Sequence, residues 1–226
     1  MSGMSEIEQV LPSQKPAEVK AELVSCASQC VRALIGHTNK DNCSGVFHTE
    51  LKWDPESGRV GLIEINCRVG GGPMYNTVEW MFGNHQSLLL ATLMVALRID
   101  PRRSREWLQA NNVPEVGPCL QSKVVLHSFL TAHRAGLKCP SPSLLAEFSR
   151  LHPEILLSRL VSPEGVSLAF PPSNEEEEYA WFCVSGISEA EARRELNKVN
   201  REWVMFWENA MGASQVCACN VDTAMA

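Results

Sequence analysis

Residues 45–53 read Gly-Val-Phe-His-Thr-Glu-Leu-Lys-Trp, residues 54–58 read Asp-Pro-Glu-Ser-Gly, and residues 59–72 read Arg-Val-Gly-Leu-Ile-Glu-Ile-Asn-Cys-Arg-Val-Gly-Gly-Gly. The first and third segments alternate apolar and polar residues, and the second contains the proline and glycine of a turn. This pattern is typical of a β-hairpin. The rest of the chain is organised around it.

The pairing register decides which side chains of the hairpin lie together. A loop of five residues makes the numbers of paired residues sum to 112, so His48 lies opposite Glu64. Glu50 then lies opposite Leu62, one diagonal step from Glu64. The register predicts a polar face of His48, Glu50, Lys52, Glu64, Asn66 and Arg68, and a core face of Phe47, Thr49, Leu51, Trp53, Ile63, Ile65 and Cys67.

The polar face has the residue types of a magnesium–phosphate site. Mg²⁺ prefers oxygen ligands and takes one or two carboxylates together with phosphate oxygens and waters, which Glu50, Glu64 and Asn66 would complement. The guanidinium of Arg68 suits an anionic phosphoryl or carboxylate group. Glycines let backbone N–H groups approach such an anion, and three follow the arginine: Gly70, Gly71 and Gly72.

The same pattern has a simpler interpretation. An antiparallel sheet with one wet face carries Glu, Lys and Arg on that face, and Lys52 or Arg68 would then pair with the two acids on the protein surface. Spacing alone leaves both interpretations open.

The two strands resemble the C-terminal part of the ATP-grasp ligases, and are most similar to the amino-acid (dipeptide) ligases and the enzymes like carnosine synthase. Both strands, their order, the offset of the arginine and the glycine run contribute to the resemblance. It implies an α+β fold, in which an antiparallel sheet with packed helices forms the C-terminal half of the ATP-grasp fold, followed by a small C-terminal lobe.

The resemblance also implies site residues and cofactors. Glu50, Glu64 and Asn66 would hold Mg²⁺ (or Mn²⁺) on ATP, and Arg68 would be the catalytic residue that meets the transferring phosphoryl group. The cofactor-binding residues would be Arg68, His48, Gly70, Gly71 and Gly72, although the role of His48 is less defined.

In the resembled family, the lysines that hold the nucleotide phosphates precede this region, and here only 44 residues come before the hairpin. We therefore expect an ATP-grasp carboxylate–amine ligase, working through an acyl phosphate, that is present as its C-terminal portion and incomplete. The alternative is a non-catalytic truncated or degenerate ATP-grasp module that keeps the fold and some metal binding.

The net charge and the distribution of apolar residues argue against two classes of partner, nucleic acid and membrane. A net charge of −6 gives no basic stripe for nucleic acid, and the sequence has neither an 18-residue apolar run nor the apolar segment of a signal peptide. We expect a cytoplasmic protein with small-molecule substrates, an amino acid or other carboxylate and an amine. It would act as a homo-oligomer or with a missing N-terminal half, and without nucleic acid or membrane.

Hydrophobic periodicity predicts the remaining elements. They are a helix over 16–36, a polar loop over 37–44, helices over 74–99 with a buried run at 88–97, a solvated connection over 101–120 and a strand over 122–130. A helix over 140–152 and strands over 155–161, 165–170 and 179–185 follow, with an acidic turn over 173–178. The last helix begins at 188 with the capping box Ser188–Glu191. The predicted parts are a flexible lead (1–14), a metal- and phosphate-binding subdomain (15–105), a small α+β lobe (106–212) and a tail (213–226).

Overall fold

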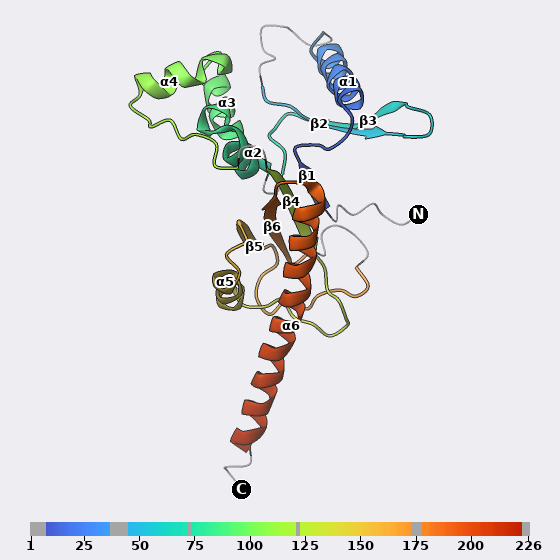
Figure 1. Ribbon diagram of the computed structural model, residues 1–226, viewed down its shortest axis with the longest axis vertical. Coiled ribbons are helices and arrows are strands. Elements are labelled where there is room, and N and C mark those ends of the chain that lie inside the picture. Colours follow the sequence, from blue (N-terminus) through green and yellow to red (C-terminus); the bar gives the residue numbers. More distant parts are fainter. Residues whose placement is uncertain (1–7, 37–44, 72–73, 121–122, 173–177, 223–226) are drawn as a thin grey trace. The chain divides into compact units, whose positions relative to one another are not determined.

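The computed structural model describes residues 8–36, 45–71, 74–120, 123–172 and 178–222, the last ten of these by their backbone only (Figure 1). The loop expected at 37–44, most of the acidic turn at 173–178 and Gly72 lie outside these residues. The chain divides into two compact units. One consists of Ser13–Ser122, and the other combines Met1–Pro12 with Lys123–Ala226.

The unit that contains both chain ends is built on an antiparallel sheet. Its described strands are β1 (Glu8–Leu11), β4 (Val124–Leu130), β5 (Leu157–Leu160) and β6 (Ala180–Gly186). They lie in the order β1-β4-β6-β5. The central strands β4 and β6 are rich in β-branched and aromatic residues and are almost wholly buried, which is the composition expected of strands covered by other elements.

Helix α6 (Glu189–Asp222) packs on β4 and β6 and completes this core (Figure 1). Trp203 and Trp207 are fully buried and stack on each other with ring centroids 5.9 Å apart. The indole N–H of Trp203 donates a hydrogen bond to the Tyr179 hydroxyl at 2.7 Å, so this buried polar pair is mutually satisfied. The aromatic packing holds one face of α6 against the sheet.

Two caps fix the helices of this unit. Ser188 accepts a hydrogen bond from the backbone N–H of Glu191, as the predicted capping box requires. Helix α5 (Pro142–Leu151) begins with Ser141 as its N-cap and Pro142 at its first position. The C-cap of α5 is His152, and the chain then turns into β5.

The other unit begins with helix α1 (Ala17–Gly36), which packs on the hairpin of β2 (His48–Trp53) and β3 (Val60–Asn66). These are the helix and the hairpin that the sequence predicts. Asp54 organises the turn between the strands: its side chain accepts a hydrogen bond from the backbone N–H of Glu56 at 3.0 Å and one from the Ser57 hydroxyl.

The register differs from the predicted one. Trp53 pairs with Val60, because the loop closes with the Asp54 N–H bonded to the Arg59 carbonyl at 2.9 Å, which makes paired numbers sum to 113. An odd sum alone would place Glu50 and Glu64 on opposite faces. A β-bulge, however, leaves one extra residue on β3, and beyond it Glu50 pairs with Glu64.

The predicted core face of the hairpin is correspondingly wrong at its β3 end. Ile63, the extra residue of the bulge, is 57% exposed, and Cys67 is also exposed. The bulge breaks the strict alternation of the strand, so period-two reasoning fails from this point on.

The second half of this unit is helical: α2 (Met74–Phe82), η2 (Asn84–Gln86), α3 (Leu88–Ala96), η3 (Pro101–Arg103) and α4 (Ser104–Ala110). The expectation that 88–97 is buried core is wrong, since Met94 is the only fully buried residue of α3. Leu89, Leu93 and Leu97, four residues apart on one helix face, are about half exposed.

Other expectations need correction. Residues 8–11 of the expected flexible lead form β1, because they pair with β4. The expected strand at 165–170 is reduced to an isolated bridge between Lys138 and Ser167. The connection at 101–120 contains η3 and α4, and α6 continues through most of the expected tail.

The predicted α+β class is confirmed, with antiparallel strands in both units. The expected boundary at 105/106 differs from the division of the chain at 122/123, because α4 packs against α3, η2 and η3. Within the described part of the chain, no helix has the length and apolarity needed to cross a bilayer.

Burial of His127 in β4 predicts an acid-sensitive core. Burial lowers the pKa of His127 to about 4 from its ordinary 6.5. Between these values the unfolded chain binds a proton that the folded protein excludes, so stability falls as the pH drops through this window. Urea titrations should show that the free energy of unfolding falls by about 2 kcal/mol between pH 7 and pH 5 because of the His127 ring. The loss should be smaller in His127→Leu, and equal losses in the two proteins would contradict this origin.

Candidate metal and phosphate site

The hairpin places the predicted acids on one face. Glu50 lies directly opposite Glu64, and His48 lies directly opposite Asn66. Since residues two apart on a strand share a face, all four side chains belong to the same surface of the sheet. The shared face is thus as predicted, although the individual pairs are not.

Two contacts organise this face. The Asn66 amide donates a hydrogen bond from Nδ2 to Glu64 Oε1. His48 Nδ1 lies 3.7 Å from Glu50 Oε1, which is too long for a hydrogen bond but close enough for an ion pair when the ring is protonated. Each acid therefore has a polar neighbour two residues away on its own strand.

The acids are neighbours but do not surround one point. Three ligand atoms of His, Cys, Asp or Glu lie within 4.8 Å of one another at only one place in the described structure, and that place is not the hairpin. Directly opposed side chains have Cβ atoms about 4.5–5.5 Å apart. Glu50 and Glu64 can therefore reach a shared ion by side-chain rotation.

Arg68 follows the end of β3 and is exposed. Its Nη1 donates a hydrogen bond to the carbonyl of Val69 at 3.0 Å. The guanidinium is thus held against its own loop, and it would have to leave this carbonyl to meet a phosphoryl group.

The glycines differ in their surroundings. Gly70 is buried, and a Cβ at this position would lie 2.7 Å from Met74 Sδ and 3.2 Å from His48 Cδ2. A Cβ on Gly71 would meet nothing within 4 Å. The missing side chain at Gly70 is therefore what allows the His48 ring to lie against the loop.

The arginines of the expected connection are engaged within the chain. Arg102 pairs with Asp100, Arg103 pairs with Glu106 at 2.8 Å, and Arg105 pairs with Glu115 at 2.9 Å. This agrees with the interpretation of the region as a solvated surface. A hollow of about 440 Å³ adjoins it, lined by His85, Gln86, Ser87, Ala91, Pro101, Arg102 and Ser104.

Sequence reasoning missed one group of possible ligands, namely His152, Glu154 and Glu202. The first two are close in sequence and carried a weak signal. Glu202 is 48 positions further along the chain, and nothing in the sequence connects it with them.

Comparison with known proteins places this geometry in context. No protein-family model matches the chain. Carnosine synthase 1 of Gallus gallus is 39% identical over 92 residues, which make up 40% of this chain and 9% of that protein. The L-amino acid ligase of Bacillus licheniformis matches 88% of this chain and 43% of its own, with a TM-score of 0.64 and 19% identity.

The chain has part of the ATP-grasp fold, and over 92 residues its sequence is similar to that of carnosine synthase 1. A further ATP-grasp fold, phosphoribosylglycinamide synthetase of Anaerococcus prevotii, matches 89% of this chain and 46% of its own, with a TM-score of 0.58 and 13% identity. The chain thus spans less than half the length of each of these proteins. ATP-grasp enzymes use ATP and Mg²⁺, and the oxygen ligands on the hairpin are of the kind that Mg²⁺ accepts.

Because Gly70 is closely packed and Gly71 is not, an alanine substitution should lower the stability of the protein only at Gly70. Gly70→Ala should displace the Met74 and His48 side chains and cost about 1 kcal/mol of stability, at the low end of overpacking because Met74 is flexible. A shift of the His48 imidazole resonances and a lower urea midpoint would report it.

Gly71→Ala is the matched control and should leave both readouts unchanged, since the new methyl group enters open space. Equal effects of the two substitutions would contradict the contact.

Proposed function

We propose that this chain contributes the metal- and phosphate-binding wall of an ATP- and Mg²⁺-dependent carboxylate–amine ligase. The observation that carries the proposal is the direct opposition of Glu50 and Glu64, with Asn66 on the same face of the hairpin. Without the bulge at Ile63 this constellation would not form.

The donor set fits magnesium. Two carboxylates and an amide carbonyl are hard oxygen ligands, and a site of this kind leaves the remaining positions to phosphate oxygens and water. Bound there, Mg²⁺ would neutralise negative charge on the phosphates during transfer. Glu50 and Glu64 would orient the ion, and the hydrogen bond from Asn66 would fix the Glu64 carboxylate.

Other residues would act on the phosphoryl group itself. Arg68 would turn from the Val69 carbonyl to the transferring group, where its planar fork stabilises spread negative charge. The backbone N–H groups of Gly70 and Gly71 would line the loop beside it, and His48 would pack between this loop and Glu50. Catalysis would then consist of positioning and charge neutralisation, without a side-chain nucleophile.

The reaction would proceed in two steps. A substrate carboxylate oxygen attacks the γ-phosphorus of ATP, the bond to the ADP oxygen breaks, and an acyl phosphate forms. An amine then attacks the acyl carbon, phosphate leaves, and the amine loses a proton to give the amide. The names of carnosine synthase 1 and the L-amino acid ligase support amino acids as the substrate class. We further propose small-molecule partners and a cytoplasmic location.

A second candidate is a non-catalytic ATP-grasp module that retains the fold and metal binding. One observation favours it: the Arg68 guanidinium donates a hydrogen bond to the carbonyl of its own loop. This non-catalytic module would have the same metal site as the proposed ligase, but it would not turn over ATP.

Metal binding is the first test. Glu64→Gln should weaken Mn²⁺ or Mg²⁺ binding by at least about tenfold while leaving the chain folded, since a neutral amide is a poorer ligand and the opposed acid is left alone. Calorimetry with each ion, and circular dichroism for the fold, would measure this.

Glu56→Gln is the matched control, because Glu56 lies in the exposed turn of the same hairpin. If wild type, Glu64→Gln and Glu56→Gln bind the ions alike, the hairpin face is only a wet sheet surface and the proposal fails.

Turnover separates the two candidates. The proposal assigns to this chain the metal-side contacts of a cleft that needs contacts on both sides of the triphosphate. We therefore expect the 226-residue chain alone to release phosphate from Mg-ATP no faster than background, with or without amino acids. A phosphate-release assay would measure it. Robust release that Arg68→Ala abolishes would contradict this expectation and show that the chain, alone or as an oligomer, builds the whole site.

A further inference from the structure

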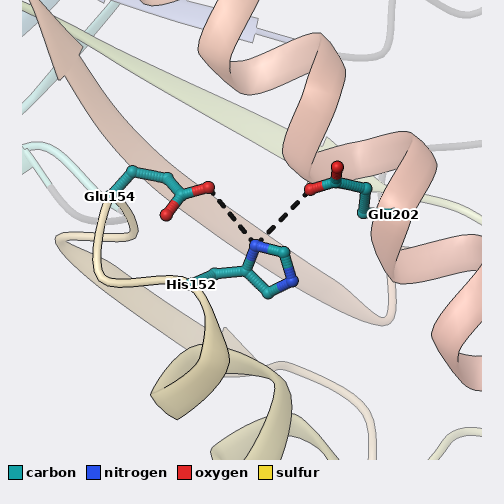
Figure 2. A group of neighbouring side chains, drawn as sticks. All are labelled: His152, Glu154 and Glu202. Carbon is teal, nitrogen blue, oxygen red and sulfur yellow. Dashed lines mark hydrogen bonds and ion pairs between the residues drawn. The ribbon is translucent and has the colours of Figure 1, made fainter.

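A second group of ligand atoms lies in the unit built on the four-stranded sheet. His152 ends α5, Glu154 follows two residues later, and Glu202 projects from α6 (Figure 2). His152 Nδ1 and one carboxylate oxygen of each acid lie within 4.8 Å of one another, the only such group in the described part of the chain. The three side chains are only 18%, 23% and 34% exposed, in the order His152, Glu154 and Glu202.

The imidazole ring is fixed in orientation. It stacks on Phe148, with ring centroids 4.1 Å apart and an interplanar angle of 33°. Its Nδ1 points at both acids, 3.3 Å from Glu154 Oε1 and 3.5 Å from Glu202 Oε2 (Figure 2). The ring therefore presents one nitrogen to the gap between two carboxylates that come from different elements.

Hydrogen bonding within the chain satisfies only one of the two acids: Glu154 Oε1 lies 3.3 Å from His152 Nδ1 and 3.0 Å from Lys198 Nζ. A single Nδ1–H can be directed at one acceptor, and both distances from this nitrogen exceed the usual length of a charge-assisted bond, about 2.7–2.9 Å. Glu202 Oε2 is buried and accepts no hydrogen bond from any described residue. A buried carboxylate oxygen of this kind is costly without a cationic or donor partner.

The two distances from His152 Nδ1 match the spacing of ligand atoms around a metal ion. In a tetrahedral zinc site with Zn–N and Zn–O bonds of about 2.0–2.1 Å, neighbouring ligand atoms are about 3.3–3.4 Å apart. The two distances from Nδ1 are 3.3 and 3.5 Å. One imidazole nitrogen with two carboxylate oxygens, and a fourth position open to water, is a donor set that Zn²⁺ accepts.

We propose that His152 Nδ1, Glu154 and Glu202 form a Zn²⁺ site, with water as the fourth ligand. The site would connect the end of α5 to α6, two elements that the chain separates by β5 and β6. Because the ion binds the folded arrangement, it would stabilise this unit by mass action. It is independent of the magnesium site proposed on the hairpin, which offers hard oxygen ligands in the other unit.

Lys198 is the internal competitor for this site. Its ammonium lies 3.0 Å from Glu154 Oε1, and its side chain is about half exposed, so it is able to swing into solvent. Burial, the largest effect, raises the pKa of Glu154, but hydrogen bonds from its own backbone, Lys198 and His152 lower it on balance. Zinc must therefore displace a cation from an ionised carboxylate.

Zinc titration of the whole chain tests the proposal. Calorimetry should detect a site in the wild type that Glu202→Gln weakens by at least about tenfold, since even outer-sphere substitutions cost 10–100-fold. Saturating Zn²⁺ should raise the melting temperature of the wild type and have a much smaller effect on the variant. Glu147→Gln, an exposed position on α5, is the matched control and should behave as the wild type.

A site-specific readout excludes zinc bound by cysteines or by the hairpin. The imidazole resonance that is lost in His152→Ala should shift on Zn²⁺ addition in the wild type and in Glu64→Gln. Lys198→Met should bind Zn²⁺ more tightly than the wild type, an effect opposite in sign to that of losing a ligand.

An unmoved His152 resonance, or equal zinc affinity in wild type and Glu202→Gln, would overturn the proposal. The group would then be an ion-pair network between α5 and α6.

Discussion

The extra residue on β3 determines which side chains share the candidate metal-binding face of the hairpin. The turn organised by Asp54 closes with an odd pairing sum, which by itself would separate the two acids onto opposite faces. The bulge shifts the pairing by one residue and returns Glu50 and Glu64 to one face. It also exposes the apolar side chain of Ile63 to water. The bulge that aligns the two acids therefore has an unfavourable effect as well. Turn and bulge must therefore be considered together.

In the other unit, the positions of side chains depend on the aromatic packing of α6. Trp203 and Trp207 are buried against the sheet, and the Trp203 N–H is satisfied by Tyr179. Because this packing fixes the rotation of α6 about its axis, Glu202 is directed toward His152, which Phe148 holds by stacking. The geometry of the His152–Glu202 pair therefore depends on the rigidity of the aromatic core beneath it.

The two candidate metal sites differ in chemistry as well as in place. The hairpin offers two carboxylates and an amide at the surface, which suits a hard ion that also binds phosphate. The α5–α6 group offers an imidazole nitrogen among more deeply buried carboxylates, which suits a borderline ion in a structural role. The first belongs to the function proposed for this chain, and the second is proposed independently of that function.

The sequence by itself determined the hairpin, α1, the capping box of α6 and the candidate residues Glu50, Glu64, Asn66 and Arg68, since these follow from local alternation, turn chemistry and a recognisable motif. Only the tertiary structure decided the register, because a bulge leaves no local signature in an alternating strand. It also decided the exposure of Leu89 and Leu93, since an apolar helix requires a covering surface but its sequence does not say where that surface lies. The meeting of His152 with Glu202 likewise depended on the packing of α6, a long-range contact that neither periodicity nor spacing encodes.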